Sequence, residues 1–336
     1  MKAFIFEQPG SGSIQEVEWK SPGFKEVLIK VKRCGICGTD LRIWAGTEPS
    51  ARNVVLGHEY SGEVVELGSG ISRVKVGDRV TVDPNIACQT CEFCLTGKVN
   101  LCSNLKALGV DIDGGFAQYC VVPETQLYPI PDYMTWDEAA LVEPVACAIH
   151  GINSAEITPG DTVLIMGGGP IGLIMLQLAK LRGASRILLS EITPSRRDFA
   201  RQLGADSVID PSNYPLADVI PPENAPDVVI ECIGNPSTQA EAIRIVKRGG
   251  RVVLFGDGQL DATFPVSSYI FYYKNLTVRG AALNPYTHLP ALKLLAEKKI
   301  ASSPLISRII PLEQLKDVLE NGYLASDIKI LVAPND

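Results

Sequence analysis

The densest group of reactive side chains in the 336-residue sequence is a set of four cysteines. They follow the spacing C-x2-C-x2-C-x7-C and are Cys88, Cys91, Cys94 and Cys102. Four thiolates from one loop can enclose a tetrahedral zinc ion without an open position, so the loop predicts a structural zinc site. Free buried cysteines and an iron–sulfur cluster, which also takes four thiolates, are the alternatives. Disulfides explain the crowding less well, because the chain is far larger than a disulfide-stapled mini-domain.

A second set of potential metal ligands is scattered along the chain. It comprises Cys37 in CGICGTD, His58 and Glu59 in GHEY, and Glu143 in VEPVACAIHG. One thiolate, one imidazole and one or two carboxylates leave a coordination position for water or an alkoxide, as a catalytic zinc requires. Each residue also has an ordinary explanation, as a core cysteine, a hydrogen-bonded turn histidine or a helix-start carboxylate. His58 is nevertheless one of only three histidines, and the acid directly after it could join the metal ligands or orient them.

A glycine-rich turn follows the apolar strand VLIM and precedes an apolar helix. The turn GGGPIG places the pattern G-x-G-x-x-G at Gly167, Gly169 and Gly172. In this context the first glycine allows the tight turn, the second lets the backbone approach a pyrophosphate, and the third lets helix and strand pack closely. A dinucleotide cofactor is therefore expected. Because hydride chemistry on a nicotinamide needs no one-electron carrier, zinc is favoured over an iron–sulfur cluster in the cysteine loop.

The next strand, RILLS, ends beside Glu191, nineteen residues beyond Gly172. An acid at this position can accept hydrogen bonds from the adenosine ribose hydroxyls and repel a 2′-phosphate, so NAD is expected rather than NADP. Arg196 and Arg197 leave NADP as an alternative, because arginines in that turn can hold a phosphate. Arg196 could equally stack on the adenine.

The elements that must position these residues change character along the chain. Residues 1 to about 145 contain short strands broken by glycine and proline, with apolar residues at period two or in continuous runs. From about residue 160 the pattern is strand, glycine turn and long helix, as in βαβ units. We predict an α/β protein in which a doubly wound parallel Rossmann sheet, residues 146–284, is inserted into a β-rich catalytic domain, residues 1–145 and 285–336.

Composition argues against several classes of partner. The formal net charge is −7 and the pI is about 5.2 without a long run of one sign, so no basic stripe is available for nucleic acid or anionic lipid. No stretch approaches the ~20 uninterrupted apolar residues of a membrane span, and the start MKAFIFEQPG lacks the features of a signal peptide. We expect a cytoplasmic protein with a small-molecule substrate and with no nucleic-acid or membrane partner.

Five motifs occur in the order typical of one enzyme family: CGICGTD, GHEYSGEVVELGSGISRVKVGDRV, the four-cysteine loop, EPVACAIHG and GGGPIG. Over nearly its whole length the chain resembles the zinc-dependent medium-chain dehydrogenases. The motif around Glu143 looks more like the sorbitol (polyol) and threonine dehydrogenase branch than like the ethanol-oxidising branch, which typically has cysteine there. The resemblance implies a GroES-like catalytic domain around the Rossmann domain and two zinc ions per chain, one catalytic and one structural.

The resemblance also implies roles for individual residues. Cys37 and His58 would bind the catalytic zinc. Glu59 and Glu143 would be direct or water-mediated ligands, and Thr39 would take the proton of the alcohol. The positions that would bind the cofactor NAD are Gly167, Gly169, Pro170, Ile171, Gly172, Glu191, Arg196, Phe255, Gly256, Asp257, Ala281, Ala282 and Leu283.

The implied activity is the oxidation of a secondary alcohol to a ketone by NAD. A polyol or sugar alcohol, or its phosphate, is the expected substrate, and a homodimer or homotetramer is the expected assembly because relatives form both. The alternatives are an L-threonine or other amino-alcohol dehydrogenase, and a non-catalytic zinc protein that binds NAD.

Two departures from the family pattern bear on the substrate. Arg42 stands where many relatives have a relay histidine, so the path of the proton beyond the first hydroxyl is unassigned. Leu283 and Asn284 stand where animal sorbitol dehydrogenases carry an Arg-Tyr pair, which argues against sorbitol itself. Asn284, Tyr286 and Trp44 are candidate contacts to a hydroxylated substrate, with packing or turn formation as the alternative.

Overall fold

The computed structural model describes every residue of the chain except 19 and 259. By internal contacts the chain divides into two compact units, one of Met1–Ala146 with Asn284–Asp336 and one of Cys147–Leu283. Helix α4, Val142–Ala155, runs from the first unit into the second. Among the described residues, no helix has the length and apolar character that crossing a membrane requires.

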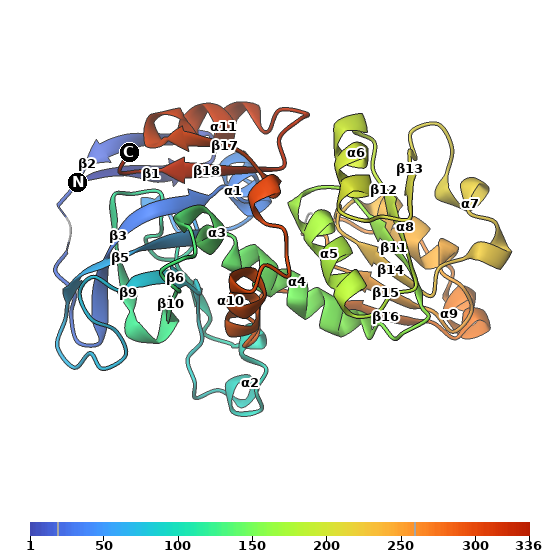
Figure 1. The fold of residues 1–336 in the computed structure, drawn as a ribbon, viewed down its shortest axis with the longest axis horizontal. Coiled ribbons are helices and arrows are strands. Elements are labelled where there is room, and N and C mark those ends of the chain that lie inside the picture. Colours follow the sequence, from blue (N-terminus) through green and yellow to red (C-terminus); the bar gives the residue numbers. More distant parts are fainter. Residues whose placement is uncertain (19, 259) are drawn as a thin grey trace. The chain divides into compact units, whose positions relative to one another are not determined.

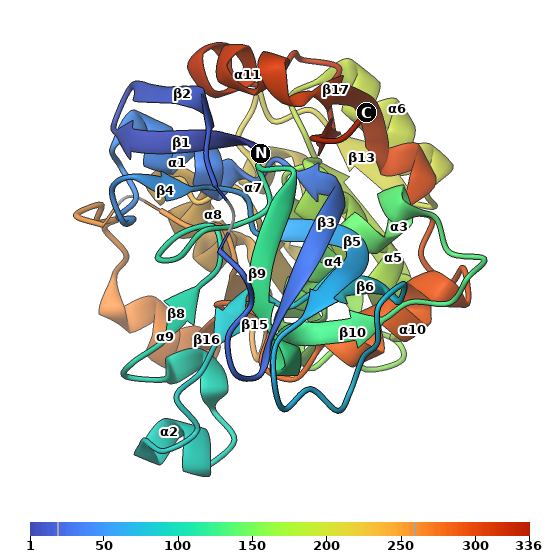
Figure 2. The same cartoon turned by 90° about the vertical axis from the view of Figure 1, so that its left-hand side faces the viewer.

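The first unit is built mainly on antiparallel sheets (Figures 1 and 2). Its larger sheet has the order β10-β6-β5-β3-β18-β17, with β9 also pairing with β3, and a smaller sheet has the order β2-β1-β4. The strands are β1 Lys2–Gln8, β2 Ser11–Glu16, β3 Glu26–Gly35, β4 Val54–Val55, β5 Glu59–Leu67, β6 Arg79–Val82, β9 Tyr119–Pro123, β10 Leu127–Pro129, β17 Ile306–Pro311 and β18 Lys329–Ala333. The last strand, β18, pairs with β3, so residues from near the two ends of the sequence are hydrogen-bonded in the same sheet.

Short helices and a small ribbon complete this unit. The helices are α1 Gly38–Ala45, α2 Glu92–Leu95, α3 Trp136–Ala140, α10 His288–Ala296 and α11 Leu315–Asn321, with 3₁₀ turns η1 Val99–Leu101, η2 Glu124–Gln126, η4 Ser303–Leu305 and η5 Leu312–Gln314. The ribbon pairs β7 Asn85–Ile86 with β8 Lys106–Ala107. Alternate residues of β3, including Val27, Ile29 and Val31, are fully buried, as expected for a strand that packs one face on a core.

The second unit is a parallel sheet with the order β13-β12-β11-β14-β15-β16. Its strands are β11 Thr162–Met166, β12 Arg186–Ser190, β13 Ser207–Ile209, β14 Val228–Glu231, β15 Arg251–Leu254 and β16 Thr277–Gly280. Its helices are α5 Pro170–Leu181, α6 Pro194–Gln202, α7 Leu216–Val219, α8 Pro236–Ile245 and α9 Ser268–Lys274, with a 3₁₀ turn, η3 Pro222–Asn224. This 3-2-1-4-5-6 order is that of the doubly wound dinucleotide-binding fold, whose ligands bind where the strand order reverses, here between β11 and β14.

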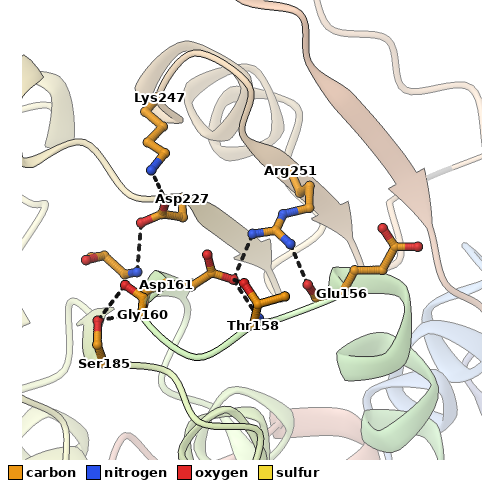
Figure 3. A network of polar contacts seen from close by, with 9 residues as sticks. Glu156, Thr158, Gly160, Asp161, Ser185, Asp227, Lys247 and Arg251 are labelled. Carbon is orange, nitrogen blue, oxygen red and sulfur yellow. Dashed lines mark hydrogen bonds and ion pairs between the residues drawn. The ribbon is translucent and has the colours of Figure 1, made fainter.

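A polar network fastens the amino-terminal ends of these strands, away from that binding edge (Figure 3). Asp161, directly before β11, accepts hydrogen bonds from the backbone of Thr158 (2.7 Å) and from Arg251 at the start of β15 (2.7 Å). These donors outweigh the effect of burial and lower the pKa of Asp161. Asp227, directly before β14, accepts from the backbone of Thr162 (2.8 Å) and pairs with Lys247. The network lies at the amino-terminal edge of the sheet. The loops at the opposite, carboxyl edge take no part in it and can bind a ligand.

Candidate active site and metal-ligand groups

Three of the four dispersed ligand candidates converge within the first unit. Cys37, His58 and Glu59 each offer one ligand atom, and these atoms all lie within 4.8 Å of one another. Strand pairing causes this convergence, because β3 and β5 run antiparallel with Gly35 opposite Glu59. The register brings the N-cap residue of α1, just beyond β3, beside the turn that leads into β5.

The point of convergence is buried and rich in acidic groups. Asp40 is fully buried, and its Oδ2 accepts a hydrogen bond from the backbone N–H of Cys37 at 2.7 Å. Its Oδ1 lies 3.7 Å from Nδ1 of His58, and neither atom has a hydrogen-bond partner among the described residues. Buried polar atoms without partners are rare in stable cores, and thiol, imidazole and carboxylate together are the ligand set that Zn²⁺ prefers. The group therefore suits a zinc ion better than a plain core.

Glu143 lies in the first turn of α4, outside the three-residue group but close enough to act on His58. Burial alone would lower the pKa of His58. The negative charges of Asp40, Cys37 and Glu143 reverse this effect and raise the pKa well above its ordinary value. Glu143 is itself buried, so its carboxylate adds to an excess of negative charge in the site.

Thr39 and Arg42 extend this group along α1. The hydroxyl oxygen of Thr39 lies 3.7 Å from Sγ of Cys37 and accepts a hydrogen bond from Nη2 of Arg42 at 3.2 Å. Nε of Arg42 also lies 3.7 Å from a carboxylate oxygen of Glu48. A hydroxyl beside the ligand group is thus available for proton transfer, and a guanidinium donates a hydrogen bond to it.

The three further candidate contacts to a substrate have different surroundings. Trp44 is buried in the core and packs at tilted angles on Phe4 and Phe6, with ring centroids 6.1 and 6.4 Å apart. Asn284 is buried, its Oδ1 accepts a hydrogen bond from Asn85 at 2.6 Å, and its Nδ2 donates one to Asp83 at 3.2 Å. Tyr286 is exposed. Core packing accounts for Trp44, and hydrogen bonds with Asn85 and Asp83 account for the buried amide of Asn284.

The sequence interpretation missed Lys329, the first residue of β18. Its ammonium group is buried, forms an ion pair with Glu59, and donates a hydrogen bond to the backbone oxygen of Ile36 at 2.8 Å. Burial alone would lower the pKa of Lys329, but the charge of Glu59 holds it above its ordinary value. The signal that could have found it is a lysine inside the otherwise apolar run IKILVA, since a lysine is almost never fully buried unless it is paired.

The four cysteines gather in the loop between β7 and β8. Figures 1 and 2 show α2, which this loop carries, extending away from the strands of its unit. The four sulfur atoms all lie within 4.8 Å of one another. Backbone N–H groups point at the sulfurs, from Cys91 to Cys88 at 3.4 Å and from Cys88 to Cys102 at 3.3 Å. Hydrogen bonds from the side chain and backbone of Thr90 lower the pKa of Cys88 to about 5, which favours the thiolate that a metal binds.

The glycine turn of the second unit has the geometry that a dinucleotide requires. Gly167 has a φ of +101°, and a Cβ placed on Gly172 would lie 1.9 Å from the carbonyl oxygen of Gly167. Gly169 is the N-cap of α5 and Pro170 is the first residue of that helix, so the free N–H groups of the first turn face the loop. A Cβ on Gly169 would meet nothing within 4 Å, which leaves space for an approaching phosphate.

Glu191 follows β12 directly and is buried against this turn. Its two carboxylate oxygens accept hydrogen bonds from the backbone of Gly168 at 2.7 Å and of Thr193 at 2.8 Å. Arg196 lies in the first turn of α6, and its neighbour Arg197 lies 2.9 Å from a carboxylate oxygen of Asp210 and donates to the backbone oxygen of Glu191 at 2.8 Å. Two arginines and one acid therefore follow β12, at the end of the strand where the family resemblance expects the adenosine ribose.

The remaining predicted cofactor residues also follow strand ends. Phe255–Asp257 follow β15, and Ala281–Leu283 follow β16. Because the strands are parallel, these segments share the carboxyl edge of the sheet with the glycine turn. A residue that the sequence interpretation missed is Glu231, which ends β14 fully buried and accepts hydrogen bonds from the backbone of Ile233 (2.8 Å) and Gly234 (2.9 Å). Its signal was an acid at the end of an apolar strand.

This fold and its ligand groups define a two-domain dehydrogenase, and comparison with known proteins agrees. Residues 23–132 match the alcohol dehydrogenase GroES-like domain, and residues 170–297 match the zinc-binding dehydrogenase family. The sorbitol dehydrogenase of Halalkalibacterium halodurans is 34% identical over 347 residues, covering 100% of both chains. The chain belongs to the zinc-dependent medium-chain dehydrogenases, in the sorbitol dehydrogenase-like branch. The predicted family and fold class are thus confirmed.

Solved structures support the same assignment across the whole chain. A zinc-binding dehydrogenase from Sinorhizobium meliloti bound to NADP has a TM-score of 0.96 and 39% identity and covers 99% of each chain. An alcohol dehydrogenase from Escherichia coli CFT073 complexed with NADH has a TM-score of 0.93 and 31% identity, also over 99% of each chain. Both nicotinamide cofactors therefore occur among close structural relatives.

Proposed function

We propose that this protein oxidises a secondary hydroxyl group of a polyol or sugar alcohol, or of its phosphate, to a ketone, with NAD as the hydride acceptor. The observation that carries the proposal is the hydroxyl of Thr39 beside Sγ of Cys37 (3.7 Å), at a group of zinc-type ligands of which His58 and Glu59 are buried. The sorbitol dehydrogenase that matches the full chain supports a polyol as substrate. In the balanced reaction the carbinol carbon gives its hydride to the nicotinamide and the hydroxyl gives up its proton.

Cys37 and His58, with Glu59 or Glu143 as a direct or water-mediated ligand, would hold the catalytic zinc. When bound, this ion supplies Lewis-acid stabilisation of the negative charge that develops on the substrate oxygen. Thr39 would relay the hydroxyl proton: its oxygen accepts that proton while its own hydroxyl proton leaves to water or to a ribose hydroxyl of the cofactor. Arg42 cannot act as the next proton carrier, because a guanidinium is not deprotonated in proteins. Its hydrogen bond instead fixes the orientation of the Thr39 hydroxyl.

A second zinc ion is proposed for the four cysteines. The sulfur atoms come from residues within a single loop and leave no evident position for a substrate, so this ion would be structural. The backbone N–H groups that point at the sulfurs would stabilise the thiolates. Metal analysis should therefore find two zinc ions per chain.

NAD is proposed as the cofactor because the carboxylate of Glu191 is buried beside Gly168, where it would repel a 2′-phosphate. The measurement is kcat/KM for NAD and for NADP with the same alcohol. We expect at least a tenfold preference for NAD, and Glu191→Ala should reduce this ratio. A native preference for NADP would reject this part of the proposal.

The proposed activity can be tested by NADH formation on a panel of tetritols, pentitols, hexitols, their phosphates, threonine and simple secondary alcohols. Turnover of a polyol that disappears in Cys37→Ser would support the proposed chemistry. Silence on the entire panel, in protein that carries two zinc ions and binds NAD, would count against it.

An anionic hydroxy compound, such as a phosphorylated polyol or an amino acid like L-threonine, is the second candidate substrate. The observation that favours it is the guanidinium of Arg42, which donates a hydrogen bond to Thr39 and could also bind a carboxylate or phosphate. In that case Arg42→Gln should raise KM for the anionic substrate roughly tenfold or more and leave KM for neutral alcohols nearly unchanged.

A homodimer or homotetramer is proposed for the assembly. In the described part of the chain, β16 pairs only with β15 and forms one outer edge of the cofactor-domain sheet, while β15 is an inner strand. An exposed edge strand can pair with a second chain. Light scattering coupled to gel filtration would measure the mass of the assembly, and a monomer at micromolar concentration would reject this proposal.

A further inference from the structure

Lys329 is unusual because it is the only buried lysine or arginine among the described residues. It opens β18, whose next residues pair with the end of β3, where Leu331 lies opposite Gly35. Taking an ammonium group out of water costs several kcal/mol unless a well-placed anion compensates. A lysine in this position therefore needs an explanation in its contacts.

Its contacts link the two chain segments that supply the ligand group. Nζ of Lys329 pairs with Oε2 of Glu59 and donates to the backbone oxygen of Ile36 at 2.8 Å, one residue before Cys37. The hydroxyl of Tyr323 donates to the same backbone oxygen at 2.5 Å. Lys329 therefore holds a carboxylate from the β5 side and a backbone carbonyl from the β3 side.

The space for this ion pair is provided by Gly35. A Cβ placed there would lie 2.2 Å from Oε2 of Glu59 and 3.0 Å from Cε of Lys329. The carboxylate of Glu59 is thus packed closely between the backbone of β3 and the lysine. The close packing restricts the orientation of the Glu59 carboxylate, and the ammonium group of Lys329 attracts its Oε2.

The buried charges around the ligand group also indicate that Lys329 acts on Glu59. Asp40, Glu59 and Glu143 are buried acids around Cys37 and His58, whereas Lys329 supplies the only buried ammonium or guanidinium group among the described residues. A cation on Glu59 reduces the negative charge available to a metal ion and repels the ion directly. The lysine therefore opposes tight coordination of the metal by Glu59.

We propose that Lys329 is a positioning residue that competes with the catalytic metal for the carboxylate of Glu59 and so keeps a coordination position open for the substrate oxygen. This inference rests on the proposed function, since it assumes a metal at Cys37 and His58. It assigns to the C-terminal strand a direct influence on the metal site. A lysine that merely filled the core would have no such influence.

The test uses Lys329→Met, which keeps an apolar stem of similar length without the charge, and Lys329→Arg, which restores a cation. The zinc-loaded protein is mixed with an excess of a chromophoric chelator, and the release of zinc is followed in time. The phase that belongs to the Cys37 group is identified as the one absent from Cys37→Ser. Release from the four-cysteine group serves as the internal control.

We expect Lys329→Met to release the Cys37-group zinc at least tenfold more slowly than the native protein, because Glu59 then becomes a full ligand. Lys329→Arg should restore most of the native rate. The absorption bands of cobalt(II) substituted at this group should also change in Lys329→Met, and kcat should fall more than KM rises. The four-cysteine phase should be unchanged.

A double-variant cycle decides whether Lys329 acts through Glu59. In a Glu59→Gln background, Lys329→Met should no longer slow the release. Tyr323→Phe is the matched control, because it removes the other donor to Ile36 and leaves the ion pair in place. Unchanged or faster release in Lys329→Met, with an unchanged cobalt spectrum, would overturn the inference. A native protein that carries zinc only in its four-cysteine group would overturn both this inference and the proposed function.

Discussion

The two ligand groups of the first unit are assembled in opposite ways. The four cysteines come from one loop of residues 88–102, and backbone N–H groups of the same loop donate to the sulfurs of Cys88 and Cys102. Cys37, His58 and Glu59 come from two segments joined by the pairing of β3 with β5, and a third segment, β18, adds Lys329. The first group is a local structure, and the second is a product of the sheet.

This difference separates stability from chemistry. A metal in a loop whose sulfurs leave no open position can hold that loop in shape but offers nothing to a substrate. In the second group His58 and Glu59 are buried, Nδ1 of His58 has no hydrogen-bond partner among the described residues, and a hydroxyl lies beside Cys37, so changes around the group should affect activity more than folding. The comparison can be tested by changing each group separately.

The largest effect is expected for Cys37→Ser. Loss of the thiolate should remove the catalytic metal and reduce kcat/KM by about 10³-fold or more, because stabilisation of the oxyanion is lost. The zinc content should fall from two to one per chain. Cys34→Ala is the matched control, since Cys34 is a buried neighbour outside the ligand group, and it should keep both zinc ions. Equal losses of activity in both variants would contradict the comparison.

The next effect is expected for Cys91→Ser in the four-cysteine loop. Losing one of four thiolates should release the structural zinc and lower Tm by roughly 5–10 °C, as the loop loses its anchor. Activity per folded molecule at 25 °C should stay within a few-fold of native. Calorimetry and NADH formation measure the two effects. Loss of activity without any loss of stability would show that this group serves the chemistry instead.

A smaller effect is expected for Gly35→Ala, which leaves all ligands in place. The new Cβ would displace Glu59 and Lys329. Activity should therefore fall roughly tenfold, and the free energy of unfolding should fall by about 1–3 kcal/mol. Gly97→Ala in the four-cysteine loop is the control. Gly97 has a φ of +80° and open space around it. The substitution Gly97→Ala should therefore cost about 1 kcal/mol of backbone strain and leave activity unchanged. Assays of activity and urea unfolding distinguish the two outcomes.

The effect that is smallest near neutral pH concerns a buried histidine outside both groups. His288 has no partner for either ring nitrogen among the described residues, and burial lowers its pKa to about 3. Between pH 6.5 and 3 the unfolded chain binds a proton that the folded chain does not, so stability falls as the pH falls, by at most about 1.4 kcal/mol per pH unit. His288→Phe should flatten this part of the stability profile, measured by urea unfolding, without changing zinc content. If the free energy of unfolding of His288→Phe changed with pH as steeply as that of the native protein, His288 would not be the source of this pH dependence.

Much of the fold could be predicted from sequence because its signals are local. The change from period-two strands to strand–turn–helix repeats separates the β-rich part from the doubly wound sheet. The glycine turn was recognisable because each glycine has a steric reason, and a Cβ on Gly172 would indeed collide with Gly167. Trp44 could have been a substrate contact or a core residue, and only the packing of its ring on Phe4 and Phe6 distinguishes the two.

The sequence by itself determined the groups whose members are neighbours in the chain: the four-cysteine loop, the glycine turn and the acid after the second cofactor-domain strand. Within a short loop, spacing limits the distances between side chains. The tertiary structure decided the rest. The register of β3 with β5 brings Cys37 to His58 and Glu59, and β18 places Lys329 behind them, across nearly 300 residues of chain. Such contacts depend on which strands pair, and no local pattern of residues records that choice.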